Sequence, residues 1–129
     1  MSKDWNEFKE YVRSRGVMAK ELFVVHSEPI VDAEEMGALM GEHLAYQKKL
    51  EAEGKLFAAG PLGDEDGAVW SREGLIILCA ESLEEARALA EGDPMHAQGK
   101  KKFSVRPWLM NEGSLRIEIR MSEKSAQIL

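Results

Sequence analysis

The sequence predicts a single α+β domain, an antiparallel sheet with helices on one of its faces. Three observations point to this fold class. Apolar runs typical of strands alternate with segments of helical spacing, a capping pattern precedes each of these segments, and glycine or proline follows most of them. The 129 residues are enough for one hydrophobic core and too few for two, so we expect one domain over residues 1–129.

Each predicted helix begins with an aspartate or serine that is followed three residues later by a glutamate. In this capping box the first side chain accepts a hydrogen bond from the backbone N–H of the glutamate. The three pairs are Asp4 with Glu7, Asp32 with Glu35, and Ser82 with Glu85. The helices are expected at residues 4–16, 32–53 and 83–91, and a glycine stands at or just after each end.

The predicted strands are rich in aliphatic and β-branched residues. They cover residues 21–27, 55–61, 74–80 and 103–110, and a fifth strand with alternating polarity covers 115–121. Pro107 interrupts the fourth strand, which implies an edge position or a bulge because proline cannot donate to a sheet. The order β-α-β-β-α-β is that of a ferredoxin-like split sheet, with an extra N-terminal helix and a C-terminal strand.

Charge and composition exclude several classes of protein. The formal net charge of −6 disfavours binding to nucleic acid or to anionic membranes. The run Lys100-Lys101-Lys102 is interpreted as a solvated strand start, in preference to a weak attractor for an anionic substrate. The single cysteine, Cys79, lies in an apolar run and is expected to be a small buried residue. Without a signal peptide or a membrane span in the sequence, we expect a cytoplasmic protein.

We expect a homodimer, because the apolar pattern of two strands predicts that both faces of the sheet are buried. Residues 22–25 and 75–78 are apolar at consecutive positions, whereas a strand with one solvated face alternates. The two helices can cover only one face of the sheet. A second copy packing sheet against sheet is the simplest cover for the other face, and two-fold dimers are the commonest oligomers.

His43 and Asp93 are the candidate catalytic residues. Helical periodicity places His43 near the centre of the apolar stripe of the second helix, facing the sheet. It is either a core histidine satisfied by a backbone carbonyl or a functional group. Asp93 stands in an Asp-Pro corner, where aspartate often bonds backbone N–H groups. If the fold brings the two together, the carboxylate fixes the tautomer of His43.

The remaining candidates are weaker. His96, Tyr46 and Trp108 are candidate pocket residues, although large aromatic residues are more often part of a core. A metal site formed by His43, Asp93 and His96 is conceivable, but no spacing matches a metal motif and no metal or other cofactor is expected.

Several segments together resemble the YciI-like (YCII-related domain) family, over about residues 20–112. They are His43-Leu44-Ala45-Tyr46 with Leu50, Gly54-Lys55-Leu56, Ala59-Gly60-Pro61-Leu62, Gly74-Leu75-Ile76-Ile77, Ser82-Leu83-Glu84-Glu85-Ala86, Asp93-Pro94 and Val105-Arg106-Pro107-Trp108. The resemblance implies a ferredoxin-like fold that dimerises into an α+β barrel, with His43 and Asp93 as the active-site pair. Many members have phenylalanine where this chain has Met95, so the wall of the site differs.

The expected function is therefore a small-molecule enzyme, a lyase or an isomerase. His43 would act as general base and Asp93 would orient it, in a cofactor-free elimination or isomerisation. The resemblance suggests aromatic-degradation intermediates as substrates. The alternative is a non-catalytic module that binds a small ligand or has a structural role. A third option, from dimeric α+β barrels that bind haem or oxidise aromatic compounds, would show in the absorbance of the purified protein.

Overall fold

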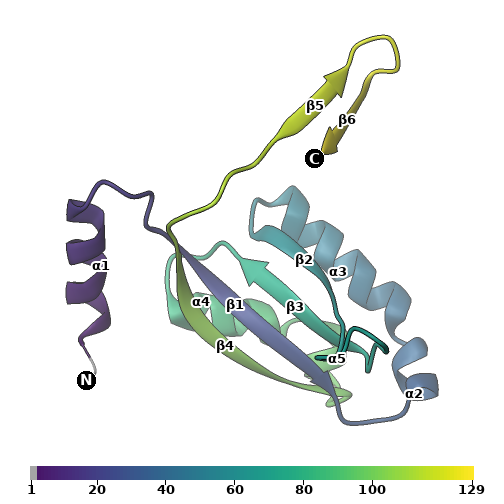
Figure 1. Cartoon of the computed structure of the whole chain (residues 1–129). Coiled ribbons are helices and arrows are strands. Elements are labelled where there is room, and N and C mark those ends of the chain that lie inside the picture. Colours follow the sequence, from purple (N-terminus) through teal and green to yellow (C-terminus); the bar gives the residue numbers. More distant parts are fainter. Residues whose placement is uncertain (1–2) are drawn as a thin grey trace. The chain divides into compact units, whose positions relative to one another are not determined.

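The computed structural model describes residues 3–129 (Figure 1). Their contacts divide them into two compact units. The larger unit is Glu21–Leu109, and the smaller unit comprises, of the described residues, 3–20 and 110–129. Within the described residues, no helix combines the length and the apolar character needed to cross a lipid bilayer.

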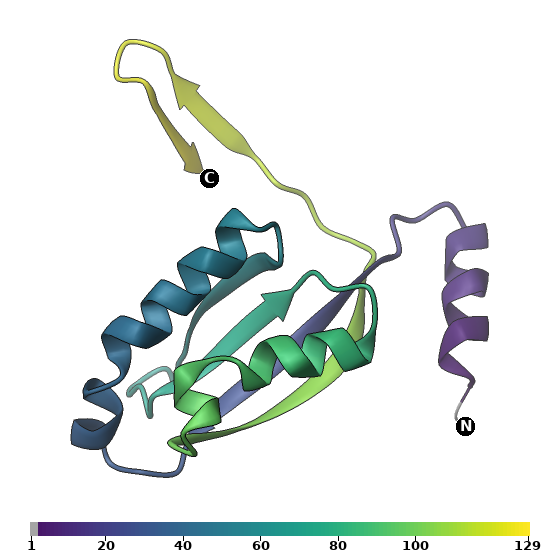
Figure 2. The ribbon, with the colours of Figure 1, turned by 180° about the vertical axis from the view of Figure 1, so that it is seen from behind.

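The larger unit contains a four-stranded sheet with the order β2-β3-β1-β4. The strands are β1 (Lys20–Pro29), β2 (Leu56–Leu62), β3 (Glu73–Leu78) and β4 (Lys101–Met110). Both β1 and β2 pair with β3 in the antiparallel sense. The long helices α3 (Met40–Ala52) and α4 (Leu83–Glu91) lie on the same face of the sheet, in front of it in Figure 2. This arrangement is the predicted mixed α+β fold and is consistent with a ferredoxin-like architecture.

The hydrophobic core lies between this face and the two helices. Side chains alternate between the two faces of a strand, so every second residue of β1 and β3 points toward the helices. Phe23, which is paired with Leu78, and Val25, which is paired with Ile76, are on this face. All four side chains are at most 8% exposed. From the helices, Leu50, Ala86 and Ala90 pack against them. The small alanines of α4 let that helix approach the sheet closely.

The predicted helix over residues 32–53 is divided into two. It consists of α2 (Ala33–Gly37) and α3 (Met40–Ala52). Asp32 caps α2 as expected, but α3 begins at Leu39 without a side-chain cap. Glycines on both sides of the break, Gly37 and Gly41, weaken the helical conformation there.

Two further elements differ from the expectations. The Asp93-Pro94 corner continues as a short helix, α5 (Pro94–Ala97), with Asp93 as its N-cap. In the smaller unit, α1 (Trp5–Ser14) agrees with the prediction, and the C-terminal strand is one arm of a hairpin, β5 (Ile117–Arg120) with β6 (Ser125–Ile128). Strand β4 is continuous through Pro107, which the edge position of β4 permits.

Tyr46 joins α3 to α4. Its hydroxyl donates a hydrogen bond of 2.6 Å to the carbonyl oxygen of Leu89. Gly92 ends α4 directly beside the phenol, and a Cβ atom at position 92 would meet the Tyr46 hydroxyl and lie 3.0 Å from its Cζ. The absence of a side chain at Gly92 is therefore what allows this helix contact.

We expect Gly92→Ala to destabilise the protein by about 1–3 kcal/mol, because the methyl group displaces the phenol from Leu89. Gly41→Ala is the matched control, since nothing lies within 4 Å of its Cβ position and alanine favours the helix. Urea unfolding measures both changes. If the clash is the cause, Tyr46→Phe costs less stability in the Gly92→Ala background than in the parent, and additive effects would contradict it.

Candidate active site

His43 and Asp93 are in contact. The Nδ1 atom of His43, on α3, lies 2.6 Å from Oδ2 of Asp93, at the start of α5. The side chain of His43 is 18% exposed and that of Asp93 is 4% exposed. The other carboxylate oxygen of Asp93 accepts the backbone N–H of Met95 at 3.0 Å. A contact across fifty residues of chain thus anchors α3 to α5.

The contact with Asp93 determines which nitrogen of His43 is available for chemistry. An ionised carboxylate can only accept, so Nδ1 of His43 carries the proton that it donates to Asp93. In the neutral ring Nε2 then holds a lone pair. No hydrogen bond or ion pair to Nε2 is found among residues 3–129. The arrangement is that of a general base held in one tautomer.

A cavity of about 270 Å³ lies beside this pair, against the helix-facing side of the sheet. Most of its wall is apolar, and His43 is one of the polar groups that reach it. The apolar wall is formed chiefly by Met40, Leu44, Ile76 and Met95, with Trp70 at the loop before β3. Ser27 and Lys101 also line it. Ser27 was not among the candidates from the sequence, and Lys101 belongs to the basic run for which attraction of an anionic substrate was the less favoured interpretation.

His96 is buried beside this cavity and holds Ser27. Its Nδ1 lies 2.7 Å from the carbonyl oxygen of Ala90, which can only accept, so Nδ1 carries a proton. Its Nε2 lies 2.6 Å from Oγ of Ser27. Burial lowers the pKa of His96, and the hydrogen bond to Ala90 opposes this change in part. The neutral ring accepts the Ser27 hydroxyl proton, which leaves the lone pairs of that hydroxyl for the cavity.

None of the three candidate pocket residues, His96, Tyr46 and Trp108, lines this cavity. Tyr46 bridges α3 and α4 as described, and burial, with the nearby charge of Asp93, raises the pKa of its hydroxyl. Trp108 is 41% exposed on β4. Alternation along this strand puts Trp108 on the face opposite to Phe103 and Val105, which pack toward the helices.

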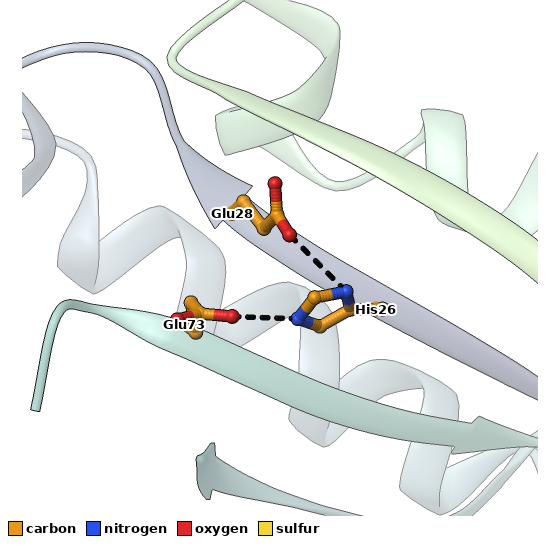
Figure 3. A group of neighbouring side chains, drawn as sticks. All are labelled: His26, Glu28 and Glu73. Atoms are coloured by element: carbon orange, nitrogen blue, oxygen red, sulfur yellow. Dashed lines mark hydrogen bonds and ion pairs between the residues drawn. The ribbon is translucent and has the colours of Figure 1, made fainter. Parts of the chain in front are cut away.

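A second polar cluster, formed by His26, Glu28 and Glu73, lies on β1 and β3 (Figure 3). One ligand atom from each residue lies within 4.8 Å of the others, close enough for a common cation. However, the two carboxylates face different ring nitrogens, Glu73 at 2.7 Å from Nε2 and Glu28 at 3.4 Å from Nδ1. The His26 ring therefore contacts a different carboxylate through each of its two nitrogens.

Comparison with known protein families matches residues 21–109 to the YCII-related domain. The chain belongs to this family. The matched segment coincides with the larger unit of the structure and contains both His43 and Asp93.

Two individual proteins are also similar to this chain in sequence. Protein YciI of Escherichia coli is 33% identical over 93 residues, which cover 67% of this chain and 95% of YciI. The protein YjpA of Bacillus subtilis is 30% identical over 70 residues, covering 54% of this chain and 75% of YjpA.

One solved structure has a similar fold. It is the 5-chloro-2-hydroxyhydroquinone dehydrochlorinase TftG of Burkholderia phenoliruptrix, in complex with 2,5-dihydroxybenzoquinone. The TM-score is 0.57 at 24% sequence identity, and the match covers 67% of this chain and 92% of TftG. The similarity establishes a shared fold between the two proteins.

We expect the stability of the protein to fall as the pH drops below the ordinary histidine pKa of 6.5, with His96 as one cause. Because the folded-state pKa of His96 is lowered, the unfolded chain binds more protons between the two pKa values, and the free energy of unfolding decreases there. His96→Gln should make this decline shallower in urea unfolding at pH 5–7. An NMR titration in which the His96 ring protonates at or above 6.5 would contradict the assignment.

Proposed function

We propose that the protein is a small-molecule enzyme that uses His43 and Asp93 for proton transfer, without a cofactor, in an elimination or an isomerisation. The observation that carries this proposal is the 2.6 Å contact between Nδ1 of His43 and Oδ2 of Asp93 at the wall of a cavity. It leaves Nε2 of His43 as a proton acceptor. Membership of the YCII-related family and the fold shared with a dehydrochlorinase support the proposal.

The proposed chemistry begins when Nε2 of His43 removes a proton from the substrate. In an elimination the electron pair left on carbon becomes a new double bond, and the leaving group departs with its own bonding pair, for example as chloride. In an isomerisation the imidazolium returns the proton to another atom of the same molecule. Asp93 stays ionised and stabilises the positive ring, as a carboxylate beside a catalytic histidine does.

The cavity limits the size of the substrate. Its volume of about 270 Å³ is just below the range of roughly 300–1,000 Å³ typical of sites for drug-sized ligands. A single substituted ring is of the right order for such a space. The apolar wall favours a molecule with an apolar ring face. These features support a ring-cleavage or halogenated aromatic intermediate as the substrate class.

The test is turnover of 5-chloro-2-hydroxyhydroquinone, followed by chloride release, beside a panel of lactones and halogenated aromatic acids. We expect His43→Gln to reduce the turnover found for any of these by about 10²- to 10⁴-fold, the usual contribution of a general base. Asp93→Asn should also reduce it, because the amide no longer enforces the same tautomer. Glu42→Gln, an exposed neighbour on α3, is the control and should have no effect.

The competing function is a non-catalytic binding module. In that case the variant His43→Gln lowers the midpoint of thermal unfolding and no member of the substrate panel is turned over. Full turnover by the His43→Gln variant would show that His43 is not the general base.

A homodimer is part of this proposal and would use the face of the sheet away from α3 and α4. On that face Val24 is paired with Ile77, and His26 with Leu75. Val24, Leu75 and Ile77 thus place apolar side chains on the side that the two long helices leave uncovered, which supports packing against a second copy.

We expect light scattering coupled to gel filtration to give twice the mass of the 129-residue chain. Ile77→Lys places a charge in the proposed interface and should yield a monomer, because an unpaired buried charge is strongly unfavourable. Lys48→Glu, on the exposed side of α3, should remain a dimer. A parent protein that elutes as a monomer at micromolar concentration would contradict this interface.

A further inference from the structure

Lys101 differs from the two lysines beside it. The Nζ atom of Lys100 lies 3.5 Å from a carboxylate oxygen of Glu35, and that of Lys102 lies 3.1 Å from one of Glu28. For Lys101 no hydrogen bond or ion pair of its side chain is found in the part of the chain that the structure describes. The middle residue of the basic run is therefore the one without a counter-ion.

The position of Lys101 makes this lack of a counter-ion significant. Alternation along β4 puts Lys101 on the same side as Phe103 and Val105, which pack toward the helices. Lys101 is partly buried and lines the cavity that contains His43. It also borders a smaller hollow of about 40 Å³ beside α2.

Nearby acidic groups are already engaged. Asp93 and Glu73 are the carboxylates whose charges act on Lys101. Asp93 accepts hydrogen bonds from His43 and from the backbone of Met95, and Glu73 contacts His26 at 2.7 Å. Burial lowers the pKa of Lys101, and the more distant Asp93 and Glu73 oppose this change. The cavity thus contains a cation that is desolvated in part and not neutralised by direct contact, which is unfavourable in the empty protein.

We propose that Lys101 binds an anionic oxygen of the ligand, so that the cavity selects small single-ring molecules carrying a phenolate, an enolate or a carboxylate. The inference names the substrate class of the proposed active site and rests on the proposed function for that site. A charge-assisted hydrogen bond from a partly buried lysine is stronger than one between neutral groups, so the ionised form of a ligand is favoured over the neutral form.

The rest of the cavity distinguishes an organic anion from an inorganic one. Trp70 presents an aromatic ring to the cavity, and its indole N–H donates to the carbonyl oxygen of Glu73 at 2.8 Å while the Arg72 guanidinium lies 5.1 Å from the ring centre. Met40, Leu44 and Met95 add apolar surface. Inorganic phosphate would be attracted by the charge of Lys101 but would make none of these apolar contacts, so it should bind weakly.

The experiment compares two probes of similar shape by calorimetry at pH 7.5. The first is 2,5-dihydroxybenzoquinone, whose hydroxyl groups are vinylogous acids and are ionised at this pH, and the second is its neutral dimethyl ether. The His43→Gln protein is used so that neither probe is turned over. We expect the anion to bind about tenfold or more tightly than the ether, the range of one charge-assisted hydrogen bond. Inorganic phosphate should bind more weakly than the anionic quinone.

Variants of the basic run assign the preference to one residue. Lys101→Met keeps the length of the side chain without its charge and should abolish the preference for the anion, whereas Lys101→Arg should retain most of it. Lys102→Met is the matched control, because this neighbour is 66% exposed, and it should bind both probes as the parent does. If Lys101 had only a structural role, Lys101→Met would lower the affinity for both probes equally and leave the ratio of the two affinities unchanged.

Several outcomes would overturn the inference: no preference for the anion in the parent, no binding of it at millimolar concentration, the same preference in Lys101→Met, or phosphate binding as tightly as the quinone. The proposed function fails separately, when His43→Gln leaves turnover intact. If the preference for the anion depends on Lys101 but no turnover depends on His43, the protein is a binding module for organic anions.

Discussion

The buried carboxylate of Asp93 is the constraint on which the candidate site depends. The Asp93 side chain is 4% exposed, and a carboxylate in such a place is costly unless both oxygens find donors. His43 supplies one donor from α3 and the backbone of Met95 supplies the other from the first turn of α5. The same group therefore begins a helix, joins two helices and sets the tautomer of the histidine. Loss of the carboxylate would therefore change both the placement of His43 and its tautomer.

Much of the fold follows from local patterns in the sequence. The N-caps predicted at Asp4, Asp32 and Ser82 are present, and each side chain accepts a hydrogen bond from the backbone N–H three residues ahead. The helix 83–91 has the bounds that Ser82 and Gly92 indicate. The division of the second helix was missed because apolar periodicity continues across it, and only Gly37 and Gly41 signal the break. The hairpin was missed because β6 carries no strong strand pattern.

The site was predictable to a smaller extent. Periodicity placed His43 toward the sheet. Its contact with Asp93, fifty residues away in sequence, depends on how α3 packs against α5, and no local sequence pattern predicts that packing. Lys101 was misjudged for a different reason. Three consecutive lysines were treated as one exposed run, although side chains alternate along a strand. If Phe103 and Val105 face the core, then Lys101 faces the same way, and this signal was present in the sequence.

Lys101 and His43 can share one small cavity because they do not compete for the same partner. His43 is held by Asp93 and offers a lone pair, while Lys101 offers a positive charge, so a substrate can meet both at once. Removal of a proton next to a carbonyl or on a phenolic ring moves negative charge onto an oxygen. A lysine that binds this oxygen in the ground state stabilises it further as the charge grows, provided that the cation is fixed in place beforehand. The interaction is stronger beside an apolar wall than in bulk water, because the effective dielectric constant there is lower. The cost of leaving Lys101 without a counter-ion in the empty protein would thus be offset when substrate binds and reacts.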